Sequence, residues 1–451
     1  MGVIPPLWSH QIAALEFARR REGVMLAMEM GTGKTRTAIE LARGCETILV
    51  ACPLSVAPVW KREFETYAPE TSIVMVDRGK NSDRALIASG GIDFARAVHV
   101  PVVVVINHES LWREPFGLFA RGMKWDLIVI DECHRAKAPG GRFSRYLDVL
   151  RRSQPDARRL GLTGTPMPHS PLDLYAQMRF IDPSLFGTSF VRFRLRYAVM
   201  GGYQQHEVVG YQNTDELMER FGRVAFQAKK QDVLDLPPEV DVEIPVALEG
   251  TTMQLYERFE RDFYAEVAEG SITATNALVK LLRLQQITSG VLKLDDGTIL
   301  SSSDAKEGVL EDLLADLSEP VVVFGRFVAD LDAVARVCAR LGKVYGEVSG
   351  RRKDLDAGRY PSGKDVLGVQ IQAGGVGIDL SAASVGVFLS TGFSLGDYLQ
   401  ARSRLHRPGQ RNKVTFVHLN AVNTIDVKVF WALKHRLQVV EELLKKGREA
   451  A

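Results

Sequence analysis

One stretch near the start of the sequence decides the fold, because an apolar run passes there into a glycine-containing loop and then into a helical pattern. It reads Val24-Met25-Leu26-Ala27-Met28-Glu29-Met30-Gly31-Thr32-Gly33-Lys34-Thr35. Glycines at 31 and 33 let backbone N–H groups approach phosphates, Lys34 reaches the β and γ oxygens, and Thr35 offers its hydroxyl to magnesium. Met28 replaces the first glycine of the usual GxxxxGK[ST] pattern. The strand–loop–helix order nevertheless predicts a phosphate-binding loop.

The residues around this loop alternate between short apolar runs and helical periodicity. The apolar runs are rich in Val and Ile on both faces, as in buried parallel strands, and cover residues 24–27, 48–51, 102–106 and 127–130. Apolar side chains at helical spacing lie between them, over residues 10–21, 34–43 and 59–67. We therefore expect an α/β lobe over residues 1–183.

A pair of adjacent acidic residues follows the last of these apolar runs. The sequence Leu127-Ile128-Val129-Ile130 continues directly into Asp131-Glu132-Cys133-His134. A buried strand that ends in acids places them at the carboxyl edge of a parallel sheet, where nucleotide sites of α/β folds lie. Asp131 would hold magnesium through water, and Glu132 would orient or deprotonate the attacking water. An apolar strand ending in Asp-Glu is common by itself, but behind a phosphate loop it predicts phosphoryl chemistry.

The rest of the chain divides into a different middle segment and a second α/β series. Residues 184–300 are rich in Arg, Phe, Tyr and Gln and show helical periodicity over 251–267 and 274–287, so we expect a largely helical insertion. Strand-like runs then resume within residues 301–451, at 321–324, 343–345, 366–371, 385–389 and 414–419. The predicted fold class is therefore α/β, with two parallel-sheet lobes separated by the insertion.

Composition excludes several classes of protein but names no partner. Of the 451 residues, 46% are apolar and 25% charged, which excludes intrinsic disorder and fibrous repeats. Lys and Arg number 57 against 55 Asp and Glu, a formal charge of +2. A nucleic-acid partner would therefore have to be held by local basic surfaces.

Cysteines and apolar runs indicate the compartment. Cys45, Cys52, Cys133 and Cys338 form no CxxC pair and no cluster with zinc-ligand spacing, so we expect no metal module or disulfide framework and a reducing environment. The longest apolar runs fall far short of the roughly 18 residues that a membrane span needs, and the first residues lack a signal-peptide pattern. We expect no membrane association and a cytoplasmic location, or a nucleoid or nuclear one.

Further motifs show a resemblance to a known family. Gly31-Thr32-Gly33-Lys34-Thr35, Asp131-Glu132-Cys133-His134 and Leu162-Thr163-Gly164-Thr165-Pro166 follow the order of motifs I, II and III of superfamily two helicases. Residues 373–380, Ala-Gly-Gly-Val-Gly-Ile-Asp-Leu, resemble motif V, and residues 400–410, ending Arg407-Pro408-Gly409-Gln410, resemble motif VI. The Arg-x-Gly-Gln ending is similar to that of Swi/Snf-like ATPases, which translocate on double-stranded DNA. The resemblance implies two RecA-like lobes and covers nearly the whole chain.

The resemblance assigns expected roles in the first lobe. ATP would be bound by Gly31, Thr32, Gly33, Lys34, Thr35 and Asp131, with magnesium at Thr35 and Asp131. Gln11, at the head of the first helix, matches the glutamine that reads the adenine edge. Contacts to the DNA backbone would come from Ser55 in motif Ia, Thr163 in motif III, and Gly374 and Gly375 in motif V. Such contacts read phosphate and shape rather than base sequence.

Motif VI supplies the expected catalytic arginines. Arg404 and Arg407 are three residues apart, so on a helix they would share a face. In the family such arginines enter the ATP site of the first lobe from the second lobe, where they stabilise charge on the transferring phosphoryl group. Together with Lys34 and Glu132 they complete the expected catalytic set, and hydrolysis would require the lobes to close.

Some segments allow two interpretations. Residues 229–237, with two lysines before a Leu-x-Leu-Pro, resemble the family's brace between lobes, and a solvated linker is nearly as good an interpretation. Arginines at 192, 194 and 196 alternate with apolar side chains and indicate either a basic DNA-facing strip or a solvated face. Asp379 and His169 stand where many relatives have Asn.

The functional expectation is an ATP-dependent translocase on double-stranded DNA that uses ATP and magnesium and acts as a monomer. One alternative is a strand-separating helicase on DNA or RNA, although the Arg-x-Gly-Gln ending weighs against RNA. An alternative of another class is a non-catalytic DNA clamp with ATP as a structural ligand. The intact set of Lys34, Thr35, Asp131, Glu132 and the two arginines weighs against that clamp.

Overall fold

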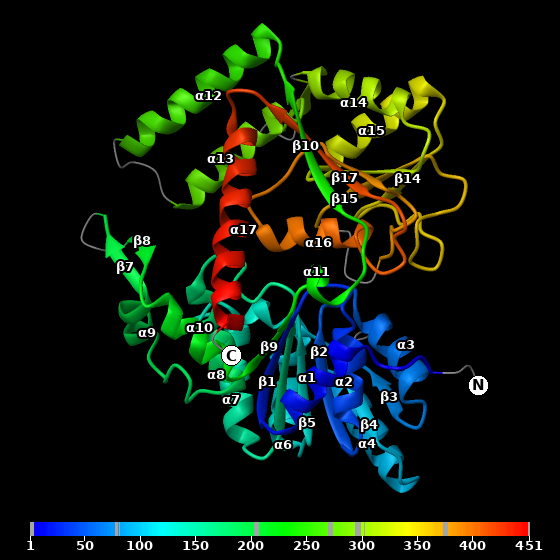
Figure 1. The fold of residues 1–451 in the computed structure, drawn as a ribbon, viewed down its shortest axis with the longest axis vertical. Coiled ribbons are helices and arrows are strands. Elements are labelled where there is room, and N and C mark those ends of the chain that lie inside the picture. The colour runs from blue at the N-terminus through cyan, green and yellow to red at the C-terminus, as the bar shows by residue number, and fades with distance from the viewer. Residues whose placement is uncertain are drawn as a thin grey trace. The chain divides into compact units, whose positions relative to one another are not determined.

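A computed structural model gives the fold of the chain and divides it into two compact units (Figure 1). It describes residues 4–76, 80, 82–202, 207–268, 274–293, 299–301, 303–372 and 378–449. The first unit comprises residues 1–235 with 438–451, and the second comprises residues 236–437. The boundary falls directly after Asp235, so each unit is described by itself.

The first unit is built on a seven-stranded parallel sheet. Its strand order is β3-β4-β2-β5-β6-β1-β9. The strands are β1 (Gly23–Met28), β2 (Thr47–Cys52), β3 (Ser72–Met75), β4 (Val102–Asn107), β5 (Leu127–Asp131), β6 (Arg158–Thr163) and β9 (Ala225–Ala228). Since β1, β2 and β5 are buried along their whole length, their near-continuous apolar runs reflect helices on both faces. The sheet predicted for the first lobe is confirmed.

Helices connect these strands in alternation, as expected for βαβ units. They are α1 (Ser9–Arg19), α2 (Lys34–Ala42), α3 (Ala57–Tyr67), α4 (Arg84–Ala97), α5 (His108–Leu111), α6 (Phe116–Gly122), α7 (Arg142–Ser153) and α8 (Leu174–Ile181), with short 3-10 turns at Cys133–Ala136 and Pro171–Asp173. Three further helices and a hairpin complete the unit: α9 (Phe190–Tyr197), β7 (Ala198–Gly201), β8 (Glu207–Tyr211), α10 (Thr214–Gly222) and α11 (Lys230–Val233).

The second unit has a six-stranded parallel sheet of order β10-β17-β16-β13-β15-β14. Its strands are β10 (Glu239–Val246), β13 (Val321–Gly325), β14 (Tyr345–Val348), β15 (Val366–Gln370), β16 (Val385–Phe388) and β17 (Val414–Ala421). The other elements are α12 (Gly250–Ala268), α13 (Ala274–Thr288), the hairpin β11 (Val291–Lys293) with β12 (Ile299–Ser301), α14 (Ala305–Asp316), α15 (Val328–Leu341), α16 (Leu395–Leu405) and α17 (Ile425–Glu449). The α/β fold class with two parallel sheets is therefore confirmed.

The predicted insertion over residues 184–300 is not a separate unit. Strand β9 pairs with β1 at one edge of the first sheet, and β10 pairs with β17 at one edge of the second. Strand β9 is only four residues long, and β10 alternates acidic with apolar residues, a pattern of half-exposed strands that the helical expectation overlooked. The segment is therefore divided between the two sheets, and its helices α12 and α13 lie in the second unit.

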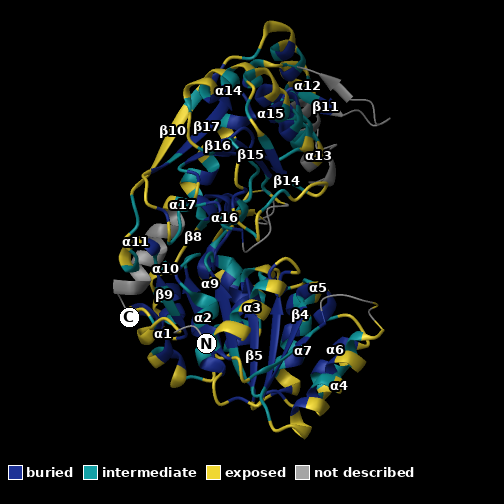
Figure 2. Ribbon diagram, turned by 90° about the vertical axis from the view of Figure 1, so that its right-hand side faces the viewer, coloured by how far each residue is buried: buried dark blue, intermediate teal, exposed yellow. Residues whose placement is uncertain are grey.

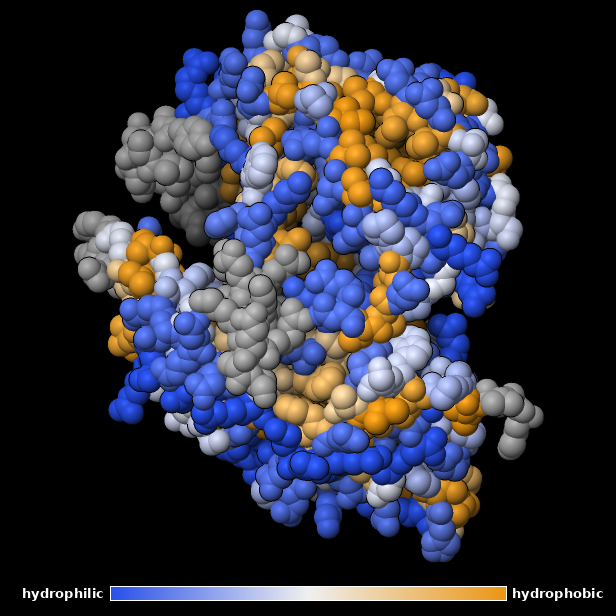
Figure 3. All heavy atoms as spheres, viewed as in Figure 1, coloured by the Kyte–Doolittle hydropathy of each residue, from blue (hydrophilic) through white to orange (hydrophobic). Residues whose placement is uncertain are grey.

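Burial follows the layers of each unit. Figure 2 shows the central strands in dark blue, while the outward sides of many helices are yellow. Each sheet has its own apolar core, which includes Trp125 and Phe180 in the first unit and Leu310 and Val334 in the second. Hydrophilic side chains cover much of the face seen in Figure 3, with apolar patches between them. Among the described residues, no helix is long and apolar enough to cross a membrane.

Candidate active site

The loop after β1 has the backbone geometry that its glycines allow. Gly31 and Gly33 have φ angles of +86° and +82°, in the left-handed region that other residues adopt at a cost. A Cβ atom at Gly33 would lie 2.2 Å from the Nε2 atom of Gln11, so a side chain there would displace the Gln11 carboxamide from the loop. Gly33 is the N-cap of α2, and the first amides of this helix are directed to the loop. The loop predicted to bind phosphate is therefore a glycine turn at a helix N-terminus.

Lys34 lies at the base of this loop, beside the acids of β5. Its Nζ atom donates hydrogen bonds to the backbone oxygens of Met28 at 2.8 Å and Glu29 at 3.2 Å. Burial lowers the pKa of Lys34, and the negative charges of Glu132 and Asp131 oppose that shift. The structure therefore brings together the loop lysine and the two carboxylates that the sequence placed about a hundred residues apart.

Gln11 and His10, on the first turns of α1, hold the same loop. Gln11 is buried, its Oε1 accepts a hydrogen bond from the Trp8 amide at 2.8 Å, and its Nε2 donates to the Gly33 oxygen at 3.2 Å. His10 donates from Nε2 to the Thr32 oxygen at 2.8 Å. Both ends of the Gln11 carboxamide are thus engaged with backbone, and its predicted adenine contact stays a prediction. His10 was not predicted, because a single histidine on a helix gives no sequence signal.

Asp131 and Glu132 stand at the carboxyl end of β5 in different environments. Both oxygens of Asp131 accept hydrogen bonds at 2.9 Å, one from the Trp60 indole and one from the Glu132 amide. Glu132 has a φ of +48°, and its buried Oε2 accepts no hydrogen bond within the part of the chain that is described. That oxygen lies 3.3 Å from the Nδ1 atom of His134. The His134 ring is therefore the nearest protein partner of this Glu132 carboxylate oxygen.

The two adjacent carboxyls have opposite pKa shifts. Burial, and then the charge of Glu132, raise the pKa of Asp131 to about 6, although the Trp60 hydrogen bond lowers it in part. Burial alone would also raise the pKa of Glu132, but the His134 ring and the Lys34 charge bring it below its usual range. Glu132 is consequently ionised near neutral pH, as a general base must be.

Motif III joins this cluster through its backbone and one hydroxyl. The Thr163 hydroxyl is 2.9 Å from Nδ1 of His134 and accepts a hydrogen bond from the Thr165 amide at 3.0 Å. Gly164 packs against the loop, since a Cβ there would lie 3.3 Å from the Met30 nitrogen. Thr163 is 0% exposed in this conformation, so its predicted contact with nucleic acid stays a prediction. Thr163 links the acidic motif to the loop.

The donor set fits magnesium bound together with a nucleotide. No group of three or more His, Cys, Asp or Glu side chains able to hold a metal occurs among the described residues. Mg²⁺ commonly takes one or two protein oxygens and completes its shell with substrate phosphates and water. The Asp131 carboxylate and the partly exposed Thr35, on the first turn of α2, match that requirement.

In the second unit, Arg404 and Arg407 do not share a helical face as predicted. Helix α16 ends at Leu405, and His406 has a ψ angle of 88°, outside the helical region. Pro408 disfavours a helical conformation at Arg407, so the helix must end before it. Arg404 is buried within the last turn, whereas Arg407 lies on the loop and donates from Nη1 to the Ile378 oxygen at 3.0 Å.

The loop that carries Arg407 is fixed by neighbouring backbone and by one carboxylate. Gln410 donates from Nε2 to the oxygens of Ala383 at 2.9 Å and Ser381 at 3.1 Å. The Nε of Arg407 is 3.8 Å from Asp379 Oδ1, which also accepts a hydrogen bond from the Ser381 hydroxyl. The Arg-x-Gly-Gln ending therefore has a structural glutamine, and Asp379 provides a charge opposite Arg407.

The predicted DNA contacts are located unequally. Ser55 is exposed on the turn between β2 and α3, so it is accessible to a ligand. Gly374 and Gly375 lie outside the described residues. The arginines at 192, 194 and 196 fall on helix α9, where alternate residues do not share a face, and Arg196 is paired with Glu216 at 2.6 Å. The three arginines therefore do not line one face: Arg192 and Arg196, four residues apart, share an exposed face, and Glu216 is paired with Arg196 there.

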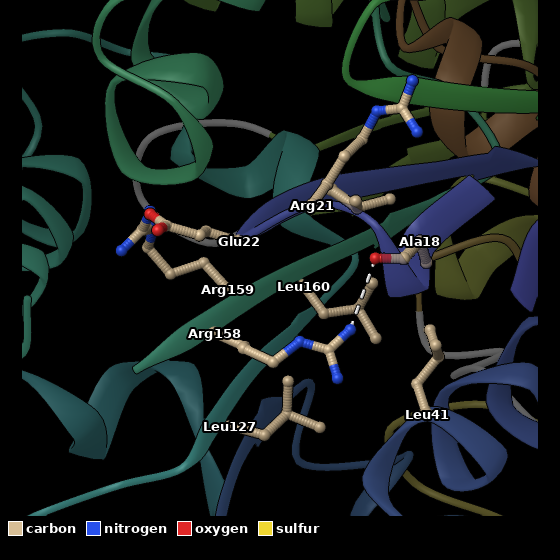
Figure 4. A pocket seen from close by; sticks show the side chains of 9 residues that line it. Ala18, Arg21, Glu22, Leu41, Leu127, Arg158, Arg159 and Leu160 are labelled. Atoms are coloured by element: carbon tan, nitrogen blue, oxygen red, sulfur yellow. Dashed lines mark hydrogen bonds and ion pairs between the residues drawn. The ribbon is translucent and has the colours of Figure 1, made fainter. Parts of the chain in front are cut away.

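A small pocket lies at the opposite edge of the first sheet, where β1, β5 and β6 begin (Figure 4). Its apolar wall includes Leu41, Leu127 and Leu160, and its arginines lie around them. Arg158 donates from Nη2 to the Ala18 oxygen at 3.3 Å, at the C-terminal end of α1. The same oxygen also accepts a hydrogen bond from the Arg21 amide at 3.1 Å, so Arg158 adds a cation to the C-terminal end of this helix. This pocket is therefore distinct from the loop that follows β1.

Comparisons with known families match both halves of the chain. Residues 10–290 match the SNF2-related domain, and residues 305–409 match the helicase conserved C-terminal domain. A Caenorhabditis elegans protein, SWI/SNF-related matrix-associated actin-dependent regulator of chromatin subfamily A-like protein 1 homolog, is 29% identical over 98% of this chain and 62% of its own. Danio rerio chromodomain-helicase-DNA-binding protein 1-like is 27% identical over 95% of this chain and 43% of its own. The chain thus spans only part of these relatives.

Among solved structures, one similar chain is the Sulfolobus solfataricus SWI2/SNF2 ATPase core in complex with dsDNA. It is 21% identical, the match covers 98% of this chain and 94% of that one, and the TM-score is 0.45.

Proposed function

Because this chain belongs to the SNF2-related family of helicase-like, DNA-dependent ATPases, we propose that it is an ATP-driven translocase on double-stranded DNA. The observation that supports this most strongly is the convergence of the glycine loop, Lys34, Asp131 and Glu132 at one edge of the first sheet. Nothing in that arrangement requires strand separation, so movement along an intact duplex is the simplest output.

Each group at this edge has a proposed task. The backbone amides of the loop and the Lys34 ammonium bind the phosphates of ATP. Thr35 and Asp131 hold magnesium, which, when bound, neutralises phosphate charge. Glu132, with its lowered pKa, orients the attacking water and accepts its proton. Trp60 fixes the Asp131 carboxylate through the 2.9 Å hydrogen bond.

The second unit completes the catalytic set in this proposal. Arg404 and Arg407 would stabilise charge on the transferring phosphoryl group, as arginine fingers do in other phosphoryl-transfer enzymes. Because both arginines belong to the second unit and Lys34 to the first, hydrolysis requires the units to approach each other. Cycles of closing and opening would then move alternate grips along the phosphate backbone.

The duplex assignment is tested by steady-state ATP hydrolysis with duplex DNA, single-stranded DNA and RNA, each over a series of salt concentrations. We expect duplex DNA to stimulate most and stimulation to fall steeply with salt, because phosphate contacts release counterions. Preferential stimulation by RNA, or unwinding of forked duplexes, would replace the proposal with a strand-separating helicase. ATP binding without turnover would instead indicate a DNA clamp.

A further inference from the structure

The first residues of the second unit make hydrogen bonds and ion pairs to helix α16. Residues 237–241 include the first part of β10, the edge strand that pairs with β17. Helix α16 carries Arg404 in its last turn, and Arg407 follows two residues after its end at Leu405. The contacts between this segment and α16 join residues more than 160 positions apart in the sequence.

Arg402 makes the central contact from the helix. Its Nη1 donates to Asp241 Oδ1 at 2.5 Å and to the Tyr398 hydroxyl at 2.7 Å, and its Nη2 is 3.3 Å from Glu239 Oε1. Its guanidinium also lies over the Phe416 ring, 4.3 Å from the centroid. Only 9% of the Arg402 side chain is exposed. A guanidinium with several donors engaged and one face covered is held in one orientation.

His406 makes the second contact, one residue before Arg407. Its Nε2 donates to the backbone oxygen of Pro237 at 2.8 Å, and its Nδ1 is 3.3 Å from Glu239 Oε2. The end of α16 is therefore tied to the same short segment as its middle. Between these two contacts lies Arg404, whose backbone oxygen accepts a hydrogen bond from the Leu380 amide at 3.0 Å.

His418, on the neighbouring strand β17, also contacts Asp241. Its Nε2 is 3.1 Å from Asp241 Oδ1, and its ring stacks on Phe388 with centroids 5.0 Å apart and planes 3° apart. Burial raises the pKa of Asp241, but the His418 hydrogen bond and the Arg402 charge together lower it to about 2. Asp241 is therefore ionised near neutral pH, where its charge is opposite to that of Arg402.

We propose that residues 237–241 form a positioning clamp on α16, which orients Arg404 and Arg407 for ATP hydrolysis; this inference rests on the proposed function. Asp241, Glu239 and the Pro237 oxygen are the fixed side of the clamp, and Arg402 and His406 are the side carried by the helix. Arg402 is thus a positioning residue, because it acts through its neighbours on the helix.

The clamp also assigns a role to the connection between the units. The first unit ends at Asp235, two residues before the clamp begins. A displacement of the chain at this boundary would reach α16 through these contacts, since the Arg402 guanidinium is buried and is held by both Asp241 and Glu239. In this proposal, the positions of Arg404 and Arg407 depend on residues 237–241 as well as on the second sheet.

The test compares Arg402→Met, Asp241→Asn and their double variant in the full chain, with Lys306→Met as the matched control. Lys306 forms another buried ion pair of the same unit, with Asp426 at 2.6 Å, and donates a hydrogen bond to the Leu389 oxygen at 2.8 Å; neither partner belongs to the clamp. We expect the clamp variants to lower kcat for ATP by about tenfold to a hundredfold at an unchanged KM, since misplacement of catalytic groups has effects of this size. The double variant should lose no more than either single variant. Arg402→Lys should recover part of the loss, because it restores the charge without the fork.

Hydrogen exchange of the α16 amides provides a second measurement that is independent of activity. We expect faster exchange at residues 402–407 in the clamp variants and unchanged exchange there in Lys306→Met. An equal loss of kcat in the clamp variants and in Lys306→Met would overturn the proposal, because the loss would then reflect lower stability of the unit and not misplaced arginines. Unchanged exchange on α16 would do so too. Lack of ATP turnover by the wild-type chain would refute the proposed function instead. The exchange measurement would still show whether the clamp contacts stabilise the end of α16.

Discussion

The loop edge of the first sheet and the α16 region of the second unit are assembled in different ways. At the loop edge, each functional group comes from a short contiguous motif at the end of a buried strand, such as Lys34 after β1 and Asp131 at the end of β5. Around α16, the decisive contacts join Arg402 to Asp241 and His406 to Pro237, across distant sequence positions. The functional residues of the first region can be recognised in short sequence motifs. The contacts of the second region join distant positions and form only in the tertiary fold.

The largest expected effects come from the loop edge itself. Lys34→Ala should abolish ATP binding and turnover, because it removes the cation nearest the phosphates and leaves Asp131 and Glu132 without its charge. Glu132→Gln should retain ATP binding but lower turnover by about a hundredfold to ten-thousandfold, the usual range for a general base. Single-turnover hydrolysis and nucleotide binding would separate the two effects. Circular dichroism spectra and melting temperatures near those of the wild type would show that folding is retained.

The next largest effect should come from the second unit. Arg407→Ala should lower turnover by roughly a thousandfold while nucleotide affinity stays nearly constant, since an arginine finger acts mainly on the transition state. Arg411→Ala, on the same loop but beyond Gln410, serves as the control. If Arg407→Ala weakened ATP binding as much as it lowered turnover, Arg407 would be a nucleotide-binding residue like Lys34. It would then not act mainly on the transition state.

A stability measurement distinguishes the two carboxyls of the first region. The pKa of Asp131 is raised to about 6 in the folded protein, above its value of 3.8 in an exposed chain. Its contribution to stability is therefore complete below pH 3.8 and is lost as the pH rises through 6. In nucleotide-free protein, the change in the free energy of unfolding caused by Asp131→Asn should become more favourable by about 1.5 kcal/mol between pH 5 and pH 8, because asparagine removes the buried charge. At every pH the variant also loses one of the two hydrogen bonds that the carboxylate accepts. A change that is the same at both pH values would show that Asp131 is not a strained carboxylate.

The opposite pH dependence of stability is expected at Trp60. Trp60→Phe keeps most of the buried ring but removes the indole donor to Asp131. The free energy of unfolding should fall by about 2 kcal/mol at pH 8, the size of a hydrogen bond to a charged group. The loss should shrink toward pH 5, where Asp131 is protonated. Chemical denaturation of the two variants over the same pH series would measure both effects, and an equal loss at both pH values would assign Trp60 to packing alone.

The sequence predicted what contiguous motifs encode. The strands at residues 24–27, 48–51 and 127–130 lie where their two-faced apolar runs placed them, because burial under helices selects such runs. Strand β6 was missed because it begins with Arg158 and Arg159, which obscure its apolar part. The edge strands β9 and β10 were missed because their pairing depends on distant partners rather than on local pattern.

The site was predictable in composition but not in its supporting contacts. Thr163 was expected to face nucleic acid, yet the fold buries it against His134, a partner 29 positions away. The shared helical face of Arg404 and Arg407 was wrong because Pro408 ends the helix, a signal present in the sequence and overlooked. No local pattern could have revealed the hydrogen bond between Trp60 and Asp131 or the ion pair of Arg402 with Asp241.

The proposed translocation is tested most directly by displacement of a third strand from a DNA triplex that is joined to a duplex track. With ATP, the wild-type chain should displace the third strand and leave the two strands of the duplex paired. Glu132→Gln should bind the same DNA and displace nothing. Displacement by Glu132→Gln, or ATP hydrolysis by the wild-type chain without any displacement, would contradict the account.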